Sequence, residues 1–243
     1  MGMLGDLING LVDIIYPKVC LVCKNKLGPE TIDNLVCREC WAKIKKNQPP
    51  FCHSCGRHLS KTNLTKNICP LCLRRPAHFD RAFSPCTYEG ITKILIHEFK
   101  YGNKDYLGFT LNRLLTEFIR EYDLPLSVLD LIVPVPLHKT RLREREYNQA
   151  EILSRHLAGE FKKEVGPDIL IRNRYTKTQT ELEPDKRLEN VRGSFSINKA
   201  SILKNKNVLL VDDVLTTGAT SSEAAAVLKA AGANIVFVLT VAN

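Results

Sequence analysis

The sequence predicts an α/β protein with a separate cysteine-rich module at its N-terminus. Residues 208–211 form an apolar run typical of a strand that is buried on both faces, and residues 129–133 form a second such run. Four Cys-x-x-Cys pairs lie between residues 20 and 72, ahead of both runs. We therefore expect two domains, with the cysteine-rich module in residues 1–80 and the sheet in residues 81–243.

The chain of 243 residues is 44% hydrophobic and 25% charged, which suits one ordinary core and a small second module. Its formal net charge is +9, and two thirds of this excess lies in residues 1–80, which contain 12 lysines and arginines against six aspartates and glutamates. Such a module can neutralise nucleic acid phosphates, but an excess of this size is also common on lysine-rich surfaces. The charge alone leaves both interpretations open.

The N-terminal segment predicts an amphipathic helix, because Leu4, Leu7, Ile8 and Leu11 are interrupted by polar residues. No apolar run approaches the length of a bilayer span, and the segment does not have the pattern of a signal peptide. An anchor at a membrane surface is the alternative, but the apolar face has no flanking lysine or arginine. We expect the helix to dock on the rest of a cytoplasmic protein, without membrane insertion.

Eight of the nine cysteines repeat with a fixed spacing. Moving the first four forward by 32 positions gives the second four, and 13 residues separate the inner cysteines of each half. An internal duplication explains this pattern. The eight residues are Cys20, Cys23, Cys37, Cys40, Cys52, Cys55, Cys69 and Cys72.

These cysteines predict two structural zinc ions, because two Cys-x-x-Cys pairs supply thiolates to the four corners of a tetrahedron. Four thiolates leave no open position for water, which argues against a catalytic zinc. A disulfide framework would need an oxidising compartment, and nothing in the sequence indicates secretion. Adjacent pairs are the simplest partners, but an interleaved arrangement or one incomplete site fits the same spacing. Cys86 stands outside the repeat and is expected to be a buried structural thiol.

The apolar run at 208–211 ends in two aspartates and is followed by a threonine-rich loop and an alanine-rich helix through Ala231. Ligands of α/β sheets bind at the carboxyl ends of strands, where the N–H groups of such a loop and the helix dipole favour a phosphate. The two carboxylates can accept hydrogen bonds from vicinal ribose hydroxyls. A solvated loop would explain the two aspartates, and a simple turn would explain the Thr-Thr-Gly segment. Neither explains why both lie together between a strand and a helix. The predicted ribose 5-phosphate clamp consists of Asp212, Asp213, Thr216, Thr217, Gly218, Ala219 and Thr220.

The clamp residues resemble the phosphoribosyl pyrophosphate motif of type I phosphoribosyltransferases. Four further blocks, at residues 99–102, 133–138, 141–149 and 179–195, make the chain similar to the ComF family of competence-associated phosphoribosyltransferase-like proteins. The similarity covers nearly the whole chain and includes the double zinc ribbon. One departure is Glu146, where the family usually has glycine.

The resemblance implies a type I phosphoribosyltransferase fold, in which helices flank a sheet of five parallel strands, preceded by a double zinc ribbon. It also implies a site for phosphoribosyl pyrophosphate and magnesium, and a role in the bacterial uptake of transforming DNA. It does not identify an acceptor.

The loop after the run at 129–133 is expected to lie beside the pyrophosphate. Magnesium and basic side chains would offset the negative charge that grows on this leaving group. The candidates are Pro136, Leu137, His138 and Arg141, with Arg143 and Arg145 as further cations nearby. A helix is expected to follow from residue 149 to residue 161. His97 and His138 have no identifiable partner in the sequence, so we assign no catalytic base.

The polar stretch at 176–192 suits either a lid over the site or an ordinary surface connection. The first functional hypothesis is a phosphoribosyltransferase, which is a glycosyltransferase of pentosyl groups, with an unknown acceptor. The alternative is a non-catalytic accessory protein that binds phosphoribosyl pyrophosphate or single-stranded DNA and contacts a helicase-like competence protein. A third is a regulator that senses phosphoribosyl pyrophosphate without chemistry, because fold does not fix function.

Overall fold

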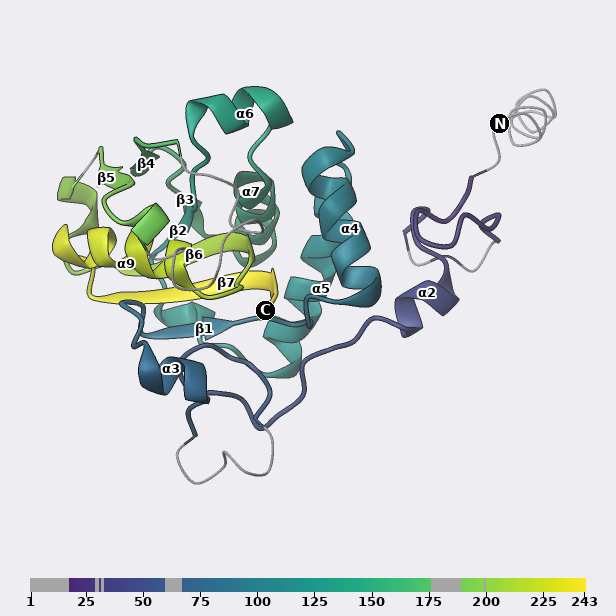
Figure 1. The fold of residues 1–243 in the computed structure, drawn as a ribbon, viewed down its shortest axis with the longest axis horizontal. Helices are drawn as coiled ribbons and strands as arrows, with labels where there is room; N and C mark the ends of the chain where they lie inside the picture. The colour runs from purple at the N-terminus through teal and green to yellow at the C-terminus, as the bar shows by residue number, and fades with distance from the viewer. Residues whose placement is uncertain (1–17, 29–30, 32, 60–66, 176–188, 199) are drawn as a thin grey trace.

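The computed structural model describes residues 18–28, 31, 33–59, 67–175, 189–198 and 200–243 (Figure 1). The predicted N-terminal helix around residues 4–12 lies outside the described residues, and so does most of the predicted lid, residues 176–188. Among the helices that are described, none is both long and apolar enough to cross a bilayer.

A sheet of five parallel strands forms the centre of the described chain, in the order β1-β7-β6-β2-β3. Both predicted apolar runs belong to it, and the predicted α/β class is confirmed. The second run enters the sheet two residues late, because the Leu129 N–H first closes a 3-10 turn by donating to the Leu126 carbonyl at 3.1 Å. The strands are β1 (Arg81–Phe83), β2 (Leu131–Pro134), β3 (Glu164–Val165), β6 (Asn207–Val214) and β7 (Ile235–Ala242).

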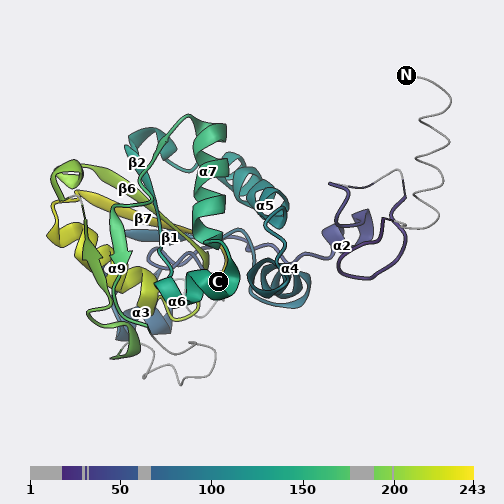
Figure 2. The ribbon, with the colours of Figure 1, turned by 90° about the horizontal axis from the view of Figure 1, so that it is seen from above.

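Helices cover both faces of this sheet (Figure 2). Leu209 and Val211 of β6 pack in the same cluster as α4 (Gly90–Tyr101), α5 (Leu107–Glu121) and α7 (Gln149–Phe161). Alternate residues of β6, Val208 and Leu210, pack instead with α9 (Ala219–Ala230). Because successive side chains of a strand point to opposite faces, β6 is buried on both sides, as its continuous apolar run predicts.

The smaller elements lie around this three-layer core. The antiparallel pair of β4 and β5 was not predicted, because strands of three residues carry too short an apolar pattern to recognise. In Figure 1 α3 lies below β1, and in both views α2 lies away from the sheet beyond α4 (Figures 1 and 2). These elements are α2 (Arg38–Ala42), α3 (Pro70–Arg74), η2 (Leu126–Val128), α6 (Lys139–Arg145), β4 (Leu170–Arg172), β5 (Phe195–Ile197) and η4 (Ala200–Leu203).

The boundary between α6 and α7 is set by two residues. Glu146 ends α6 with φ 64°, a left-handed conformation that costs a non-glycine residue about 1–2 kcal/mol. The resemblance described above implies glycine at this position, and here the Glu146 carboxylate accepts a hydrogen bond from the Asn103 side chain at 2.8 Å. Asn148 then caps α7 by accepting from the Ala150 N–H at 3.1 Å, which confirms the predicted helix over 149–161.

Gly108 of α5 allows the close approach of α7, and we expect Gly108→Ala to destabilise the fold by about 1–3 kcal/mol. A Cβ at this position would lie 2.4 Å from Cγ2 of Ile152, which is fixed to a branched carbon and cannot turn away freely. Gly159 of α7 is the control, because a Cβ there would meet nothing within 4 Å. Gly159→Ala should raise stability by up to about 1 kcal/mol, since alanine favours helix. Urea denaturation of both variants tests this, and equal effects would contradict it.

Candidate functional site

The strand-loop-helix unit predicted to bind phosphate is formed by β6, residues 215–218 and α9; we call residues 215–218 the threonine loop. The Leu215 N–H donates to the Ala242 carbonyl of β7 at 2.8 Å, which holds the loop against the sheet. Gly218 caps α9 with φ 77°, a left-handed conformation that glycine adopts without strain. The N–H groups of the first turn of α9 therefore open onto the loop, an arrangement that favours an anion.

Asp213 forms a buried ion pair with a lysine from a distant part of the chain. Its Oδ1 lies 2.7 Å from Nζ of Lys100 in the last turn of α4, and the two side chains are only 12% and 16% exposed. Burial lowers the pKa of Lys100, but the charges of Asp213 and Asp212 outweigh burial and raise this pKa above its ordinary value. Lys100 is thus the fixed counter-ion of the acidic pair. It was not among the predicted site residues, although the family-like block at 99–102 contains it.

Asp212 is less well compensated than its neighbour. Burial and the charge of Asp213 raise the pKa of Asp212 to about 7, although Lys100 and Arg172 act in the opposite direction. One of its oxygens accepts a hydrogen bond from the Asp213 N–H at 2.8 Å. Near neutral pH the Asp212 side chain is therefore divided between its acid and carboxylate forms, so it can donate as well as accept a hydrogen bond.

Arginines from two further elements lie near the acidic pair. Arg172, at the end of β4, is half-buried, and burial lowers its pKa, while the Asp212 carboxyl raises this pKa and Arg141 and Arg145 lower it. The Arg145 guanidinium also donates to the Gln149 side chain at 3.1 Å. Arg172 was missed by the sequence because nothing in a three-residue strand marks its last residue.

The loop after β2 lies next to the threonine loop, because β2 and β6 pair in parallel register with Pro134 opposite Val211. The predicted residues Pro136, Leu137 and His138 are half-buried along this loop, which leads into α6. The parallel pairing thus brings the two predicted halves of the site to one edge of the sheet.

Arg141 and His138 both contact Tyr175. The Arg141 guanidinium lies 5.3 Å from the centre of the Tyr175 ring, and the centre of the His138 ring lies 5.5 Å from it. Nδ1 of His138 accepts a hydrogen bond from the Thr140 N–H at 3.3 Å, so this histidine caps α6. His97 is exposed on α4. The contacts give His138 a structural role and place Arg141 near the cations described above.

The eight repeated cysteines form two clusters, in each of which the four Sγ atoms lie within 4.8 Å of one another. Adjacent pairs are therefore partners, and the interleaved arrangement is excluded. All nine cysteines belong to the described part of the chain and none forms a disulfide. Four converging thiols suit tetrahedral zinc, so the clusters fit two structural zinc ions. The first tetrad is Cys20, Cys23, Cys37 and Cys40, and the second tetrad is Cys52, Cys55, Cys69 and Cys72.

The duplication extends to the backbone of the two tetrads. Lys24 and Gly56 occupy equivalent positions and are both left-handed, with φ 63° and 70°. The N–H of each donates at 2.9 Å to the carbonyl of the first cysteine of its own tetrad, Cys20 or Cys52. The same turn therefore presents the first two thiols in both copies.

Cys86 is fully buried outside both tetrads, as predicted. Burial raises the pKa of its thiol to about 12, and the nearby Thr92 and the charge of Lys46 offset this only in part. A neutral, inaccessible thiol of this kind acts as a small core residue.

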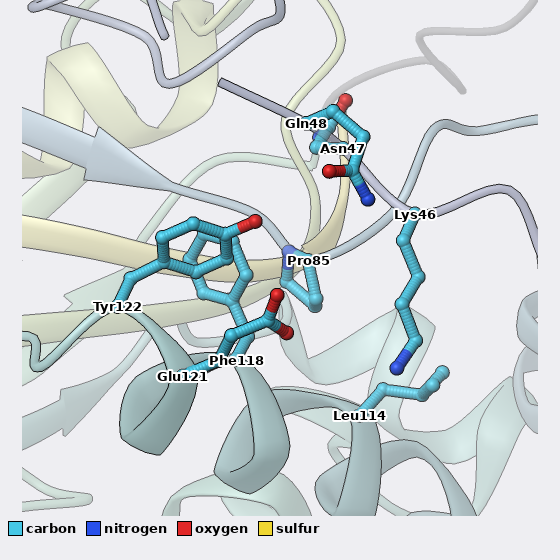
Figure 3. A pocket seen from close by; sticks show the side chains of 8 residues that line it. All are labelled: Lys46, Asn47, Gln48, Pro85, Leu114, Phe118, Glu121 and Tyr122. Carbon is cyan, nitrogen blue, oxygen red and sulfur yellow. The ribbon is translucent and has the colours of Figure 1, made fainter. Parts of the chain in front are cut away.

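A pocket lies between α5 and the segment that joins the two tetrads (Figure 3). It shares no lining residue with the predicted clamp. The Asn47 side chain in its wall donates to the carbonyls of Ser84 at 2.9 Å and Cys86 at 3.1 Å, so its polar groups hold the joining segment in place. We interpret the pocket as a packing seam. Its lining residues are Lys46, Asn47, Gln48, Pro85, Leu114, Phe118, Glu121 and Tyr122.

Two protein-family models each match a part of the chain. Residues 11–76 match the double zinc ribbon domain and residues 148–243 match the phosphoribosyl transferase domain. The first match spans both tetrads, and the second spans the strand-loop-helix unit. Together with the parallel sheet, they establish a type I phosphoribosyltransferase fold with an N-terminal double zinc ribbon.

Similar proteins cover nearly the whole chain. Competence protein F of Haemophilus influenzae is 32% identical over 219 aligned residues, and the alignment covers 88% of this chain and 91% of the relative. The DNA utilization protein YhgH of Salmonella typhi is 29% identical, with 90% and 94% covered, and competence protein ComFC of Bacillus subtilis is 27% identical, with 90% and 91% covered. Among solved structures, a glutamine phosphoribosylpyrophosphate amidotransferase from B. subtilis overlays 59% of this chain and 30% of its own, at 21% identity and a TM-score of 0.36.

We expect the purified protein to carry two zinc ions, one in each tetrad. Cys40→Ser and Cys72→Ser replace equivalent ligands of the first and second tetrads, and each should lower the zinc content by about one ion per chain. Elemental analysis against protein concentration measures this. A single ion in the unaltered protein, or loss of both ions from either variant, would contradict the assignment.

We expect the two aspartates to have opposite effects on stability. The pKa of Asp212 rises on folding from 3.8 to about 7, so the unfolded chain releases this proton first and the fold loses stability as pH increases through that window. Asp212→Asn removes this loss. Its free energy of unfolding, relative to that of the unaltered protein, should therefore rise by about 1 kcal/mol or more from pH 4 to pH 8. Asp213→Asn leaves Lys100 without its nearest partner and should lose about 2–3 kcal/mol at pH 8.

Denaturant unfolding at several pH values measures both variants. If Asp212→Asn were destabilising at pH 8 by as much as Asp213→Asn, the description of Asp212 as the poorly compensated carboxyl would be wrong.

Proposed function

The chain belongs to the family of competence protein F, and on this premise we propose that it is a phosphoribosyltransferase-like protein that binds phosphoribosyl pyrophosphate with magnesium at the carboxyl end of β6. The observation that carries the proposal is the junction of a buried acidic pair with a loop that opens onto a helix N-terminus. Each half of this junction suits one part of a ribose 5-phosphate.

The threonine loop and the first turn of α9 are the proposed phosphate site. Loop N–H groups, the positive end of the α9 dipole and the hydroxyls of Thr216, Thr217 and Thr220 can all donate to phosphate oxygens. Gly218 closes the loop in a left-handed conformation that glycine adopts without strain.

Asp212 and Asp213 are the proposed ribose site. Two carboxyl groups at the end of one strand can accept hydrogen bonds from the two vicinal hydroxyls of a ribose. The ion pair with Lys100 keeps Asp213 charged and fixed, and Asp212 changes its protonation near neutral pH. We therefore expect ligand binding itself to change the protonation of Asp212.

Arg141, Arg145, Arg172 and Lys100 are the proposed pyrophosphate-side cations, beside the predicted residues Pro136, Leu137 and His138. Their charge would stabilise the negative charge that grows on pyrophosphate as its bond to ribose C1 breaks. The oxygen ligands of the acidic pair are of the kind that magnesium prefers, so Asp212 and Asp213 fit this ion. Magnesium, when bound, supplies further positive charge to the leaving group.

The proposed reaction is transfer of the phosphoribosyl group to a nucleophilic acceptor with release of pyrophosphate. We propose that the protein acts in the handling of DNA taken up by a bacterium, and the relatives named competence protein F and DNA utilization protein YhgH support this role. We propose no acceptor and no catalytic base.

A second candidate is a non-catalytic accessory protein that binds single-stranded DNA and a helicase-like partner through its N-terminal module. The observation that favours it is the excess of 12 basic over six acidic residues in residues 1–80. Binding that weakens steeply with salt and disappears without those residues would support it.

We expect calorimetric titration of the zinc-loaded protein with phosphoribosyl pyrophosphate and magnesium to show one site per chain. Asp212→Asn should weaken the affinity by about tenfold or more, since it removes a charged hydrogen-bond acceptor from the ribose. The double variant with Asp213→Asn should not bind measurably. Asp130→Asn is the control, because Asp130 lies at the opposite end of the sheet, where it accepts from the Asn207 N–H at 2.8 Å.

Asp212→Asn is the more informative single variant, because it is not expected to lose stability. Retained binding with an unchanged affinity in this variant would refute the ribose site. Binding of the ligand would lead to a search for acceptor-dependent pyrophosphate release, whereas a complete absence of binding to the unaltered protein would favour the second candidate.

A further inference from the structure

Arg57, two residues after Cys55 in the second tetrad, reaches the threonine loop. Its Nη2 donates to the Leu215 carbonyl at 3.3 Å and also to the Thr216 carbonyl, 159 positions further along the chain. The residue is half-buried. Hydrogen bonds from a charged donor are stronger than those between neutral groups. The second tetrad and the loop are therefore joined by a direct side-chain contact.

Fixing these two carbonyls also fixes the direction of the loop N–H groups. In a trans peptide the C=O of one residue and the N–H of the next point in opposite directions. The carbonyls of Leu215 and Thr216 face Arg57, so the N–H groups of Thr216 and Thr217 face away from it. Arg57 thus orients donors of the proposed phosphate site from the opposite side of the backbone.

The second tetrad is itself fastened to the sheet. The Ala82 N–H of β1 donates to the Ser54 carbonyl at 2.7 Å, and the Asn243 side chain donates to the Cys55 carbonyl at 3.3 Å. A Cβ at Gly56 would lie 2.5 Å from the Ala82 carbonyl oxygen, so this approach requires glycine. Arg57 is consequently held on a turn that the thiols and β1 both constrain.

The segment after the second tetrad contacts the same site from another direction. The His78 N–H donates to Oγ of Ser222 in the first turn of α9 at 3.0 Å. The Phe79 ring lies 3.8 Å from the position of a Cβ on Gly218. The segment after the second tetrad thus contacts the N-terminal end of α9, whereas Arg57, within the tetrad, contacts the threonine loop.

The first tetrad makes a different set of contacts. The residue equivalent to Arg57 is Asn25, whose carbonyl accepts the corresponding hydrogen bond from Cys20 at 2.8 Å. The neighbouring Lys24 side chain donates to Leu21 at 2.8 Å, within its own turn. In both views α2 lies away from β6 and α9 (Figures 1 and 2). The two tetrads have the same backbone conformation at these turns. Among the described residues, only the second tetrad contacts the threonine loop.

We infer that Arg57 is a positioning residue through which zinc in the second tetrad sets the geometry of the threonine loop. The four thiols of that tetrad fit zinc, and the metal would hold together the turn that carries Arg57. The proposal that the loop binds phosphate rests on the proposed function, whereas the coupling between metal and loop does not.

Hydrogen exchange of the ligand-free, zinc-loaded full chain tests the coupling. Arg57→Ala should accelerate exchange of the amides in residues 215–221 by at least tenfold, because a charge-assisted contact that restrains the loop is lost. Arg57→Lys keeps the charge but not the forked donors. Its loop amides should exchange at a rate between those of the unaltered protein and Arg57→Ala. Asn25→Ala is the matched control at the equivalent position of the first tetrad and should leave the loop unchanged.

A matched pair of ligand variants tests the metal. Cys72→Ser should accelerate exchange in the loop, and Cys40→Ser, at the equivalent position of the first tetrad, should not. Exchange in β7 reports whether a variant has unfolded as a whole. If Cys72→Ser has unfolded, loop exchange in Arg57→Lys is used to test the coupling. The inference is overturned if loop exchange is unchanged in Arg57→Ala, or if Cys40→Ser and Cys72→Ser affect the loop equally while β7 stays protected.

Titration with phosphoribosyl pyrophosphate and magnesium separates this inference from the proposed function. If both hold, Arg57→Ala weakens binding at least tenfold and Asn25→Ala does not. If the unaltered protein does not bind the ligand but the loop still responds to Arg57→Ala and Cys72→Ser, the proposed function fails and the coupling stands. If the ligand binds and Arg57→Ala changes neither affinity nor exchange, the coupling fails and the proposed function stands.

Discussion

The burial of β6 between two parallel neighbours is the constraint on which the rest of the structure depends. β2 and β7 pair with it on either edge, and helices cover both of its faces, so the strand is removed from water almost to its end. Close to its end the strand nevertheless carries two carboxyl groups, of which Asp213 is buried and Asp212 half-buried. Such groups are costly unless they are paired or protonated, and both solutions are used: Asp213 pairs with Lys100, and the pKa of Asp212 rises.

This electrostatic problem explains why so many parts of the chain meet at one sheet edge. The cation that balances Asp213 comes from α4, the guanidinium that acts on Asp212 comes from β4, and the guanidinium beneath the threonine loop comes from the second tetrad. Each is supplied by an element with its own anchorage in the fold. The site is therefore defined before any ligand arrives, as preorganised electrostatics requires.

The strand-loop-helix unit and the eight metal-binding cysteines could be predicted from sequence because each is a local pattern with a regular spacing. Lys100, Arg172 and Arg57 could not, because each reaches the site from a distant part of the chain and its neighbours in sequence reveal nothing of that contact. The pairing of the cysteines also needed the structure, since both arrangements have the same spacing. The domain boundary at residue 80 and the roles of the clamp residues stay predictions.

The position of β7 affects the order in which the parts of the chain can fold during synthesis. This strand lies between β1 and β6, yet it begins at residue 235, more than 150 positions after the last cysteine of the second tetrad. A chain emerging from the ribosome can close both metal sites long before it can close the sheet, because long-range strand pairing is slow and the tetrads are local. Until β7 arrives, β1 and β6 expose unpaired edges, which are prone to aggregate. The two tetrads can therefore form early, whereas the sheet between β1 and β6 closes only after β7 has been made.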